Sequence, residues 1–286
     1  MCRAMKVSED AFYAWGRGKT YRLSPQKSEL AAVVKEVFYL HRRRYGARRI
    51  SAELVAEGVP VGRRLAGSLM KAQGLTAIRP RRFMPRTTDS RHGLGFSPNL
   101  LLDASAEPSG AGQAIVGDIT YLPLANGRFC YLATFQDKFT RRIVGWQVSS
   151  RMTAQLVLDA LNRARSRRLI GRGAIIHTDR GSQYASVEYR RLLYINGFRQ
   201  SMSGKGNCYD NAQAESFFSR FKAELLEGGN FESVEQARSE IFSYIEGYYN
   251  RIRRHSSLGY KSPMEFEKQL KIKNGGTKQS FVSCFS

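Results

Sequence analysis

The sequence predicts an α/β domain built on a mixed sheet of five strands with flanking helices, preceded by a small all-α domain. Three observations support this prediction. Apolar residues recur at helical spacing through the first third of the chain. From residue 114 the pattern changes to three strands joined by tight turns. After residue 150, two short strands alternate with helices.

The first third of the chain predicts three main helices. Residues 25–44 carry an apolar stripe that ends in a basic cluster, and residues 47–58 and 62–74 each end at a glycine. The tight turn between the last two segments, with Arg63 and Arg64 at the start of the second, is typical of a DNA-binding helix-turn-helix. A plain helical hairpin with solvated arginines is the alternative, and the basic composition favours the helix-turn-helix.

Residues 79–113 predict a linker. They contain several prolines and a Gly-Ala-Gly run, so we expect extended or irregular backbone. The arginines of this segment would track the phosphates of a duplex, or the segment is a basic tether without specific contacts. We therefore expect a helical region at 1–78, this linker, an α/β domain at 114–268 and a disordered tail at 269–286.

The α/β domain opens with three strands in a meander. Residues 114–124 and 128–137 predict the first two strands, and the Asn126-Gly127 dipeptide between them favours a two-residue hairpin turn. A second turn leads to the third strand, at 142–150. Consecutive strands joined in this way form an antiparallel sheet.

The second half of this domain alternates helices with strands. Residues 174–179 form a short apolar run, typical of a central strand buried on both faces, and residues 198–203 predict a fifth strand. A long helix at 233–249 opens with a Ser233-x-x-Gln236 capping box. The remaining predicted helices cover 153–168, 186–196 and a segment that begins near Asn211.

The chain is strongly basic, with a net charge of +22 and a sequence pI near 10.2. Such a charge predicts a polyanionic partner, and nucleic acid is a better candidate than an anionic membrane surface. No apolar run of about 18 residues is present to span a bilayer, and the first residues do not resemble a signal peptide. The four cysteines and four histidines are scattered, which argues against a zinc site or a disulfide framework. We expect a cytoplasmic, reduced protein.

Two aspartates lie where the predicted sheet would place them side by side. Asp118 is inside the first strand, where aspartate is unusual, and Asp179 directly follows the central apolar run. In ribonuclease-H-like folds the first and fourth strands are neighbours, and the active sites of open α/β sheets gather at strand ends. The sequence therefore predicts a ribonuclease-H-like sheet that brings the two aspartates together.

Glu215 is the third acid of interest. It lies in the first turns of its predicted helix, off the phenylalanine-rich apolar stripe. An exposed glutamate at this place is commonly no more than a favourable charge at the helix dipole. If the stripe packs on the sheet, however, Glu215 approaches Asp118 and Asp179. Three such carboxylates require cations between them, and two Mg²⁺ ions, with Mn²⁺ as a substitute, would clamp the oxygens of a phosphoryl displacement.

The spacing and the flanking motifs are similar to those of a known family. Sixty residues separate Asp118 from Asp179, and 35 separate Asp179 from Glu215. The flanking motifs are GDITYLP, HTDRGSQY, SMSGKGNCYDNAQAESFF and YNRIRRHSSLGYKSP, in this order. Together with YGARRI at 45–50, they resemble the OrfB transposases of bacterial insertion sequences, whose catalytic core is similar to that of retroviral integrases. The resemblance extends from about residue 1 to residue 268.

The resemblance implies a DNA transposase that cleaves the ends of its element and transfers the strands into target DNA. Asp118, Asp179 and Glu215 would be the catalytic, metal-binding triad of acids. The implied partners are the terminal repeats, the target DNA, further copies of the chain in a synaptic complex and the upstream-frame protein of the same element. The protein would be associated with the bacterial nucleoid.

Nine basic or polar residues near the helix-turn-helix, the Glu215 helix and the basic run at 249–263 are candidate DNA contacts. They are Arg48, Arg49, Arg63, Arg64, Lys205, Asn211, Lys222, Arg253 and His255. For Asn211 a helix cap is the default role, and for His177 a packed strand histidine. Asp137 is expected to be a turn residue. Glu224, on the same helix as Glu215 but outside the triad spacing, is expected to tolerate replacement by glutamine.

Two other function classes remain open at this point. A catalytically silent DNA-binding regulator would need the helix-turn-helix but not three acids at this spacing. A plain ribonuclease-H-like nuclease would hydrolyse DNA without joining strands. Mutation of one acid separates the first class from a transposase, and a strand-transfer assay separates the second.

Overall fold

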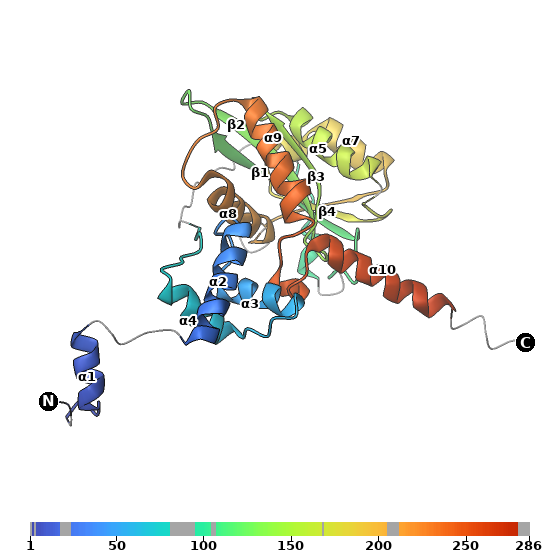
Figure 1. The fold of residues 1–286 in the computed structure, drawn as a ribbon. Helices are drawn as coiled ribbons and strands as arrows, with labels where there is room; N and C mark the ends of the chain where they lie inside the picture. Colours follow the sequence, from blue (N-terminus) through green and yellow to red (C-terminus); the bar gives the residue numbers. More distant parts are fainter. Residues whose placement is uncertain are drawn as a thin grey trace, which may run out of the picture. The chain divides into compact units, whose positions relative to one another are not determined.

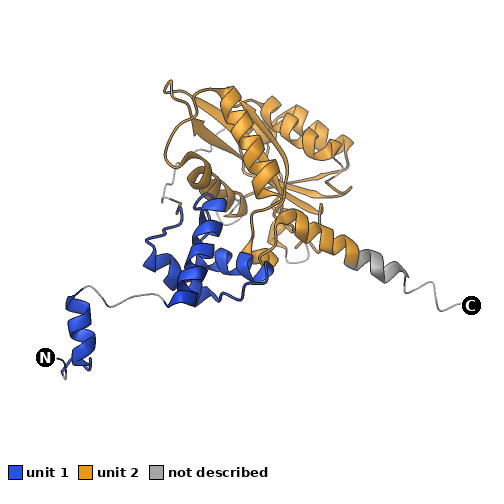
Figure 2. Cartoon of the chain, viewed as in Figure 1, with its two compact units in different colours: residues 1–78 blue, residues 79–286 orange. Residues whose placement is uncertain are grey.

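The computed structural model describes residues 2, 4–17, 24–80, 95–103, 107–167, 169–204 and 212–279. The chain forms two compact units, residues 1–78 and residues 79–286 (Figure 2). Within the described ranges, no helix combines the length and the apolar character that a bilayer crossing requires.

The first unit is all-α, as the sequence predicts. Its helices are α1 (Glu9–Gly16), α2 (Pro25–Leu40), α3 (Ala47–Ala56) and α4 (Arg63–Ala72). The apolar stripes of the last three meet in a common core that includes Val34, Ile50 and Leu69, all at most 1% exposed. Gly58 and Gly74 follow α3 and α4 with φ of +84° and +68°, the left-handed conformation in which helices commonly end.

The second unit contains the predicted mixed sheet (Figure 1). Its strands are β1 (Ala114–Pro123), β2 (Phe129–Asp137), β3 (Ile143–Ser149), β4 (Ile175–Thr178) and β5 (Arg199–Met202). The strand order is β3-β2-β1-β4-β5. The first three strands pair antiparallel, whereas β4 pairs parallel with both β1 and β5. This arrangement confirms the ribonuclease-H-like fold class.

The hairpin between β1 and β2 turns at the predicted place, but the prediction of a two-residue turn was wrong. The Leu124 nitrogen donates to the Arg128 oxygen at 2.8 Å, and Pro123 lies opposite Phe129, so the loop has three residues, 125–127. Gly127 adopts φ of +76°, and the side-chain oxygen of Asn126 accepts a hydrogen bond from the backbone nitrogen of Arg128 at 3.0 Å. Because the turn length sets the pairing register, this dipeptide also sets which residues of the two strands face each other.

Helices cover both faces of the sheet (Figure 1). One core lies against α5 (Ala154–Ser166), α6 (Ser182–Ala185) and α7 (Val187–Ile195). Here Gly145 allows α5 to approach β3, because a Cβ atom at this position would lie 2.2 Å from the carbonyl oxygen of Ala160. The opposite core lies against α8 (Ala212–Leu226), α9 (Val234–Phe242) and the π-helical segment η4 (Ser243–Tyr249).

Two further local expectations were wrong. The helix expected at 233–249 ends at Phe242 and continues as a π-helix, although Ser233 caps its start by accepting a hydrogen bond from the Gln236 nitrogen at 3.1 Å. Residues 269–279, expected in a disordered tail, are the second half of helix α10 (Pro263–Gln279).

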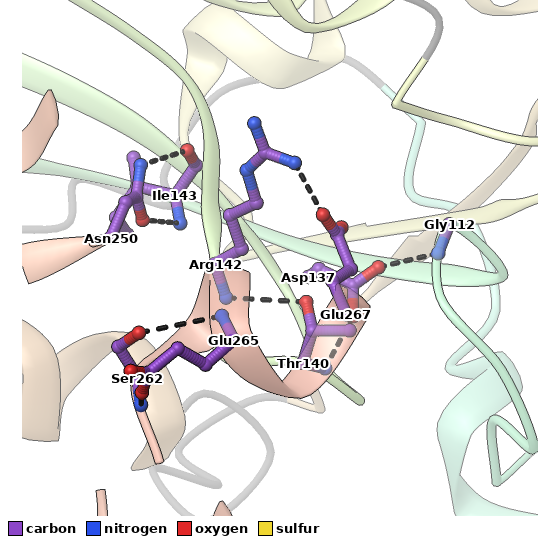
Figure 3. A network of polar contacts seen from close by, with 9 residues as sticks. All are labelled: Gly112, Asp137, Thr140, Arg142, Ile143, Asn250, Ser262, Glu265 and Glu267. Carbon is purple, nitrogen blue, oxygen red and sulfur yellow. Dashed lines mark hydrogen bonds and ion pairs between the residues drawn. The ribbon is translucent and has the colours of Figure 1, made fainter. Parts of the chain in front are cut away.

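Polar contacts hold α10 and η4 to the turn between β2 and β3 (Figure 3). Arg142 forms an ion pair with Glu267 of α10. The Asn250 side chain bonds both the nitrogen and the oxygen of Ile143, each at 3.0 Å. Asp137 accepts hydrogen bonds from the backbone nitrogens of Gly112 and Thr140, which confirms its expected role as a turn residue.

Residues 95–103, in the middle of the predicted linker, are not a loose tether. The Pro98 oxygen accepts a hydrogen bond from the Met202 nitrogen, and the Ser97 hydroxyl donates to the Gln200 side-chain oxygen at 2.8 Å. The short 3-10 helix η1 (Leu100–Leu102) packs against β4 and β5. The backbone of residues 95–103 is irregular, as expected, but it is bound along the edge strand β5. We call residues 95–103 the docked segment.

Candidate active site

Strand pairing places Asp118 beside Asp179. The parallel register of β1 and β4 runs from Ala114 opposite Ile175 to Val116 opposite His177. Continuing this register puts Asp118 opposite Asp179, which directly follows β4. Gly117 permits this close approach, because a Cβ atom there would lie 2.6 Å from a ring carbon of Phe135 and 3.1 Å from the Thr178 methyl group.

Asp118 lies in an environment that disfavours its charge. Burial raises the pKa of this carboxyl well above its usual range, and the negative charges of Asp179 and Glu215 raise it further. Two groups act in the opposite direction: the Ile119 backbone N–H, which donates to Asp118 at 2.8 Å, and the Lys222 ammonium. The three predicted acids and one lysine therefore act on one another within a single site.

Asp179 is held by the turn that follows β4. The Gly181 nitrogen donates a hydrogen bond to a carboxylate oxygen of Asp179 at 3.0 Å. A Cβ atom at Gly181 would lie 3.1 Å from that same oxygen. A side chain at 181 would crowd the carboxylate, so glycine keeps this turn tight.

Helix α8 presents Glu215 to the solvent side of the site. Its buried residues Ala214, Phe217, Phe218 and Phe221 belong to the predicted apolar stripe. The three phenylalanines pack into the core on that face of the sheet. Glu215 is exposed in the first turn of the helix. It lies off the stripe, as the sequence predicts, and close enough to raise the pKa of Asp118.

As the side chains stand, no group of three His, Cys, Asp or Glu residues among the described ranges is arranged to hold a metal ion. The chemistry of the donors nevertheless fits Mg²⁺, which prefers carboxylate oxygens. Burial first, and then the charge of Asp179, raise the pKa of Asp118, and a cation bound beside this carboxyl would favour its charged form.

Lys222 lies beside the acids, on the same helix as Glu215. Its side chain is half-buried, and this burial lowers the pKa of its ammonium group, while the charge of Asp118 raises it. The two opposite charges favour each other's charged form: Lys222 lowers the pKa of Asp118, and Asp118 raises that of Lys222. Lys222 thus brings positive charge to the site, and its predicted contact with DNA stays a prediction.

Arg253 does not have its predicted role. Its side chain is 1% exposed and forms an ion pair with Glu224, which is 5% exposed. The Arg253 Nε donates to Glu224 at 2.9 Å, and the Tyr244 hydroxyl donates to the same carboxylate at 2.8 Å. The prediction of a phosphate contact by Arg253 is therefore wrong, because its guanidinium is buried and committed to Glu224. The expectation that Glu224 tolerates replacement is wrong for the same reason.

The apolar stripe of α8 contained a signal for this pair. Glu224 follows Phe217 by seven residues and Phe221 by three, so it lies on the stripe. A charged residue on a buried stripe requires a buried partner. No local pattern identifies that partner as Arg253.

The other predicted DNA contacts vary in exposure. Arg48, Arg63 and Arg64 are exposed on α3 and α4, whereas Arg49 is half-buried with its guanidinium 5.8 Å from the centre of the Tyr45 ring. His255 is half-buried, and its ring lies edge-on to Tyr249 at 4.9 Å. The remaining two, Lys205 and Asn211, lie outside the described residues.

Comparison with known protein families assigns the two halves of the chain. A model of an HTH-like domain matches residues 25–83. Two models of an integrase core domain match residues 108–208 and 196–263. A transposase for insertion sequence IS3A (InsF) of Escherichia coli K12 is 43% identical over 93% of this chain and 92% of its own length. The chain belongs to the family of insertion-sequence transposases.

A second relative supports the same family. The transposase for insertion sequence element IS904 of Lactococcus lactis is 41% identical to this transposase over 85% of the chain and 95% of its own length. Among solved structures, the HTLV-2 integrase catalytic core domain in complex with magnesium is 12% identical, with a TM-score of 0.44. It covers 56% of this chain and 99% of the integrase core chain. The integrase-core models and the two transposase relatives, rather than this structural likeness, show that the chain is an enzyme with an integrase core that acts on DNA.

Proposed function

We propose that this transposase cleaves the ends of its own insertion sequence and joins them to target DNA with Asp118, Asp179 and Glu215 as the catalytic acids. One feature carries the proposal: the β1–β4 register, continued two residues past its last pair, Val116 opposite His177, leads to Asp118 opposite Asp179. The charges of Asp179 and Glu215 both raise the pKa of Asp118. The alternative role for Glu215, a favourable charge at the helix dipole, does not account for its electrostatic effect on Asp118.

The three acids would hold two Mg²⁺ ions, with Mn²⁺ as a substitute. When bound, the ions supply the positive charge that activates an attacking oxygen and stabilises a leaving oxygen at phosphorus. Each acid has its own support: Asp118 belongs to the central strand β1, Asp179 accepts from the Gly181 N–H, and Glu215 is carried by the packed helix α8. Such support fixes the geometry that phosphoryl transfer depends on.

Positive charge near the acids would position the DNA. Lys222 lies beside Asp118 and would neutralise a phosphate that enters the site. In the first unit, the exposed Arg48, Arg63 and Arg64 of α3 and α4 would contact the terminal repeats. His255 would contribute a further contact. A synaptic complex of several copies, with the upstream-frame protein of the element as a partner, would hold the two DNA ends together.

The test uses the full chain, a duplex that carries the terminal repeat of its element, a target plasmid and Mg²⁺. We expect cleavage at the repeat end and joined products, both absent with Asp118→Asn and with Asp179→Asn. Cleavage without joining would indicate a plain nuclease. DNA binding without either product, and unchanged by both substitutions, would indicate a catalytically silent regulator.

A further inference from the structure

His177 is a fully buried histidine two residues before Asp179. It lies on β4 opposite Ser201 of β5 and is 0% exposed. Its Nδ1 is 2.8 Å from the Ser201 hydroxyl oxygen, and its Nε2 is 3.2 Å from the Ser203 hydroxyl oxygen. Both ring nitrogens are therefore hydrogen-bonded, each to a serine at the end of the neighbouring strand.

The partners of the two serines give these bonds a direction. The Leu100 backbone nitrogen donates to the Ser201 hydroxyl oxygen at 2.9 Å, so the Ser201 proton is available for Nδ1 of His177. A neutral imidazole that accepts at Nδ1 carries its hydrogen on Nε2 and donates it to Ser203. The Ser203 hydroxyl in turn donates to the carbonyl oxygen of Thr178 at 3.4 Å. One chain of hydrogen bonds thus leads from the docked segment to the last residue of β4.

A second contact joins the docked segment to the residue after Asp179. The Arg180 guanidinium lies 4.8 Å from the centre of the Phe96 ring, and its Nε donates to the Ser203 carbonyl oxygen at 2.8 Å. The Ser203 nitrogen donates to the Thr178 oxygen at 2.9 Å. Ser203 therefore receives both connections, at the point where the chain leaves β5 toward the helix that carries Glu215.

We propose that His177 is a positioning residue that couples binding of the docked segment to the placement of the catalytic carboxylates. Through Ser201 it contacts the docked segment, and through Ser203 it fixes the ends of β4 and β5, from which Asp179 and the path to Glu215 emerge. The proposal rests on the function proposed above for these acids. It goes beyond a packing role, since an apolar side chain would fill the same buried space without holding either serine.

The first test breaks each connection separately in the full chain. Ser201→Ala removes the bond between His177 and the docked segment, and Ser203→Ala removes the bond to the end of β4. Hydrogen exchange without DNA or metal measures how firmly the docked segment is bound. The Mg²⁺ concentration for half-maximal end cleavage measures how well the carboxylates are placed to bind the metal. We expect Ser201→Ala to speed exchange of residues 95–103 by about threefold to tenfold, as for the loss of one buried hydrogen bond. Both variants should raise the Mg²⁺ requirement by at least about threefold.

Ser186→Ala is the matched control. Ser186 caps α7 by accepting a hydrogen bond from the Tyr189 nitrogen at 3.2 Å, and it has no bond to the His177 chain in the structure. Ser186→Ala removes the same hydroxyl group as Ser201→Ala and Ser203→Ala, and it also removes one hydrogen bond. It should leave both the exchange rates of residues 95–103 and the Mg²⁺ requirement at the wild-type values. An equal rise in the Mg²⁺ requirement with Ser186→Ala would overturn the proposal. So would Ser201→Ala with faster exchange but an unchanged Mg²⁺ requirement.

The second test replaces the histidine. His177→Gln keeps an amide that accepts and donates, whereas His177→Leu fills space without hydrogen bonds. We expect the glutamine variant to retain more protection of residues 95–103 and a lower Mg²⁺ requirement than the leucine variant. The reverse order would show that His177 acts only by packing. Because the exchange measurement needs no cleavage, it distinguishes failure of this coupling from failure of the proposed catalytic function.

Discussion

Glu224 and Arg253 form a buried ion pair that ties helix α8 to the chain that follows η4. Two nitrogens of the guanidinium bond the two carboxylate oxygens of Glu224, and the Tyr244 hydroxyl occupies a further lone pair. Since α8 also carries Glu215, the ion pair holds the helix that presents this proposed catalytic acid.

Replacing Glu224 is expected to destabilise the fold. Glu224→Leu leaves the Arg253 charge buried without a partner, which costs roughly 3–5 kcal/mol when one member of such a pair is removed. The measurement is urea denaturation of the full chain. Glu235→Gln, at an exposed position of α9, is the control and should change the unfolding free energy by less than about 0.5 kcal/mol.

The double variant Glu224→Leu with Arg253→Met tests whether charge is the cause. We expect it to recover much of the stability lost in Glu224→Leu, because no unpaired charge remains buried. The single variant Arg253→Met is measured as well. If the double variant loses as much unfolding free energy as Glu224→Leu and Arg253→Met added together, then packing rather than charge explains the effect.

Glu215→Gln is expected to abolish cleavage and strand joining together, by a hundredfold or more, the usual order when one charge-stabilising group leaves a reaction centre. Folding should survive because Glu215 is exposed. DNA binding should persist or tighten, because a negative charge leaves the site. Gel-based cleavage and joining assays, with a parallel DNA titration, measure all three. Glu235→Gln is again the control. Near-normal activity of Glu215→Gln would indicate that Glu215 only stabilises the N-terminus of its helix.

The raised pKa of Asp118 predicts how stability depends on pH without divalent cations. Between the usual aspartate pKa near 4 and the raised pKa of Asp118, the folded state binds more protons than the unfolded state. This contribution therefore stabilises the fold at low pH and is lost as pH rises through the folded pKa. Asp118→Asn should be more stable than the wild type at neutral pH, and the difference should shrink toward pH 4. Thermal denaturation in EDTA at several pH values decides this, and equal pH profiles would contradict it.

DNA affinity is expected to fall steeply with salt. A net charge of +22 predicts many phosphate contacts, and log K should fall by about 0.9 per neutralised phosphate for each unit of log salt concentration. Arg63→Ala and Arg64→Ala should each reduce this slope by about 1 if each arginine contacts one phosphate. Fluorescence titrations at several salt concentrations measure it. If log K does not change with salt concentration, phosphate contacts are not the main source of the DNA affinity.

Truncation provides a test of the two units. The docked segment belongs to the second unit, so a cut near residue 80 is expected to give a better-folded integrase core than a cut near residue 110. The shorter core lacks the Leu100 bond to Ser201 and should be less protected from exchange at β5. Neither core should keep the selectivity for element ends that the full chain shows. Equal end selectivity of an isolated core would contradict a DNA-reading role for α3 and α4.

Much of the fold follows from local patterns in the sequence. The Asn126-Gly127 turn, the capping serine at 233 and the phenylalanine stripe around Glu215 are all short-range signals, and the structure has each of them. The positions of Asp118 and Asp179 relative to each other follow from strand order once the fold class is recognised.

The features that sequence reasoning missed depend on contacts between distant residues. Glu224 and Arg253 are 29 positions apart, and Leu100 and Ser201 are 101 apart. Neither pairing has a periodicity that marks it in advance. The change from α- to π-helix after Phe242 is similar, because the same residues carry a helical pattern in either form.

The strand order also has a consequence for how the protein is made. The β1–β2–β3 meander joins neighbours in the chain, so it closes with short loops, whereas pairing of β1 with β4 must bring together residues about sixty positions apart. The two aspartates meet only through that second, slower pairing. During synthesis, a nascent chain that has completed the meander carries Asp118 without its counterpart. The proposed active site thus cannot assemble on the ribosome before β4 has emerged and paired with β1.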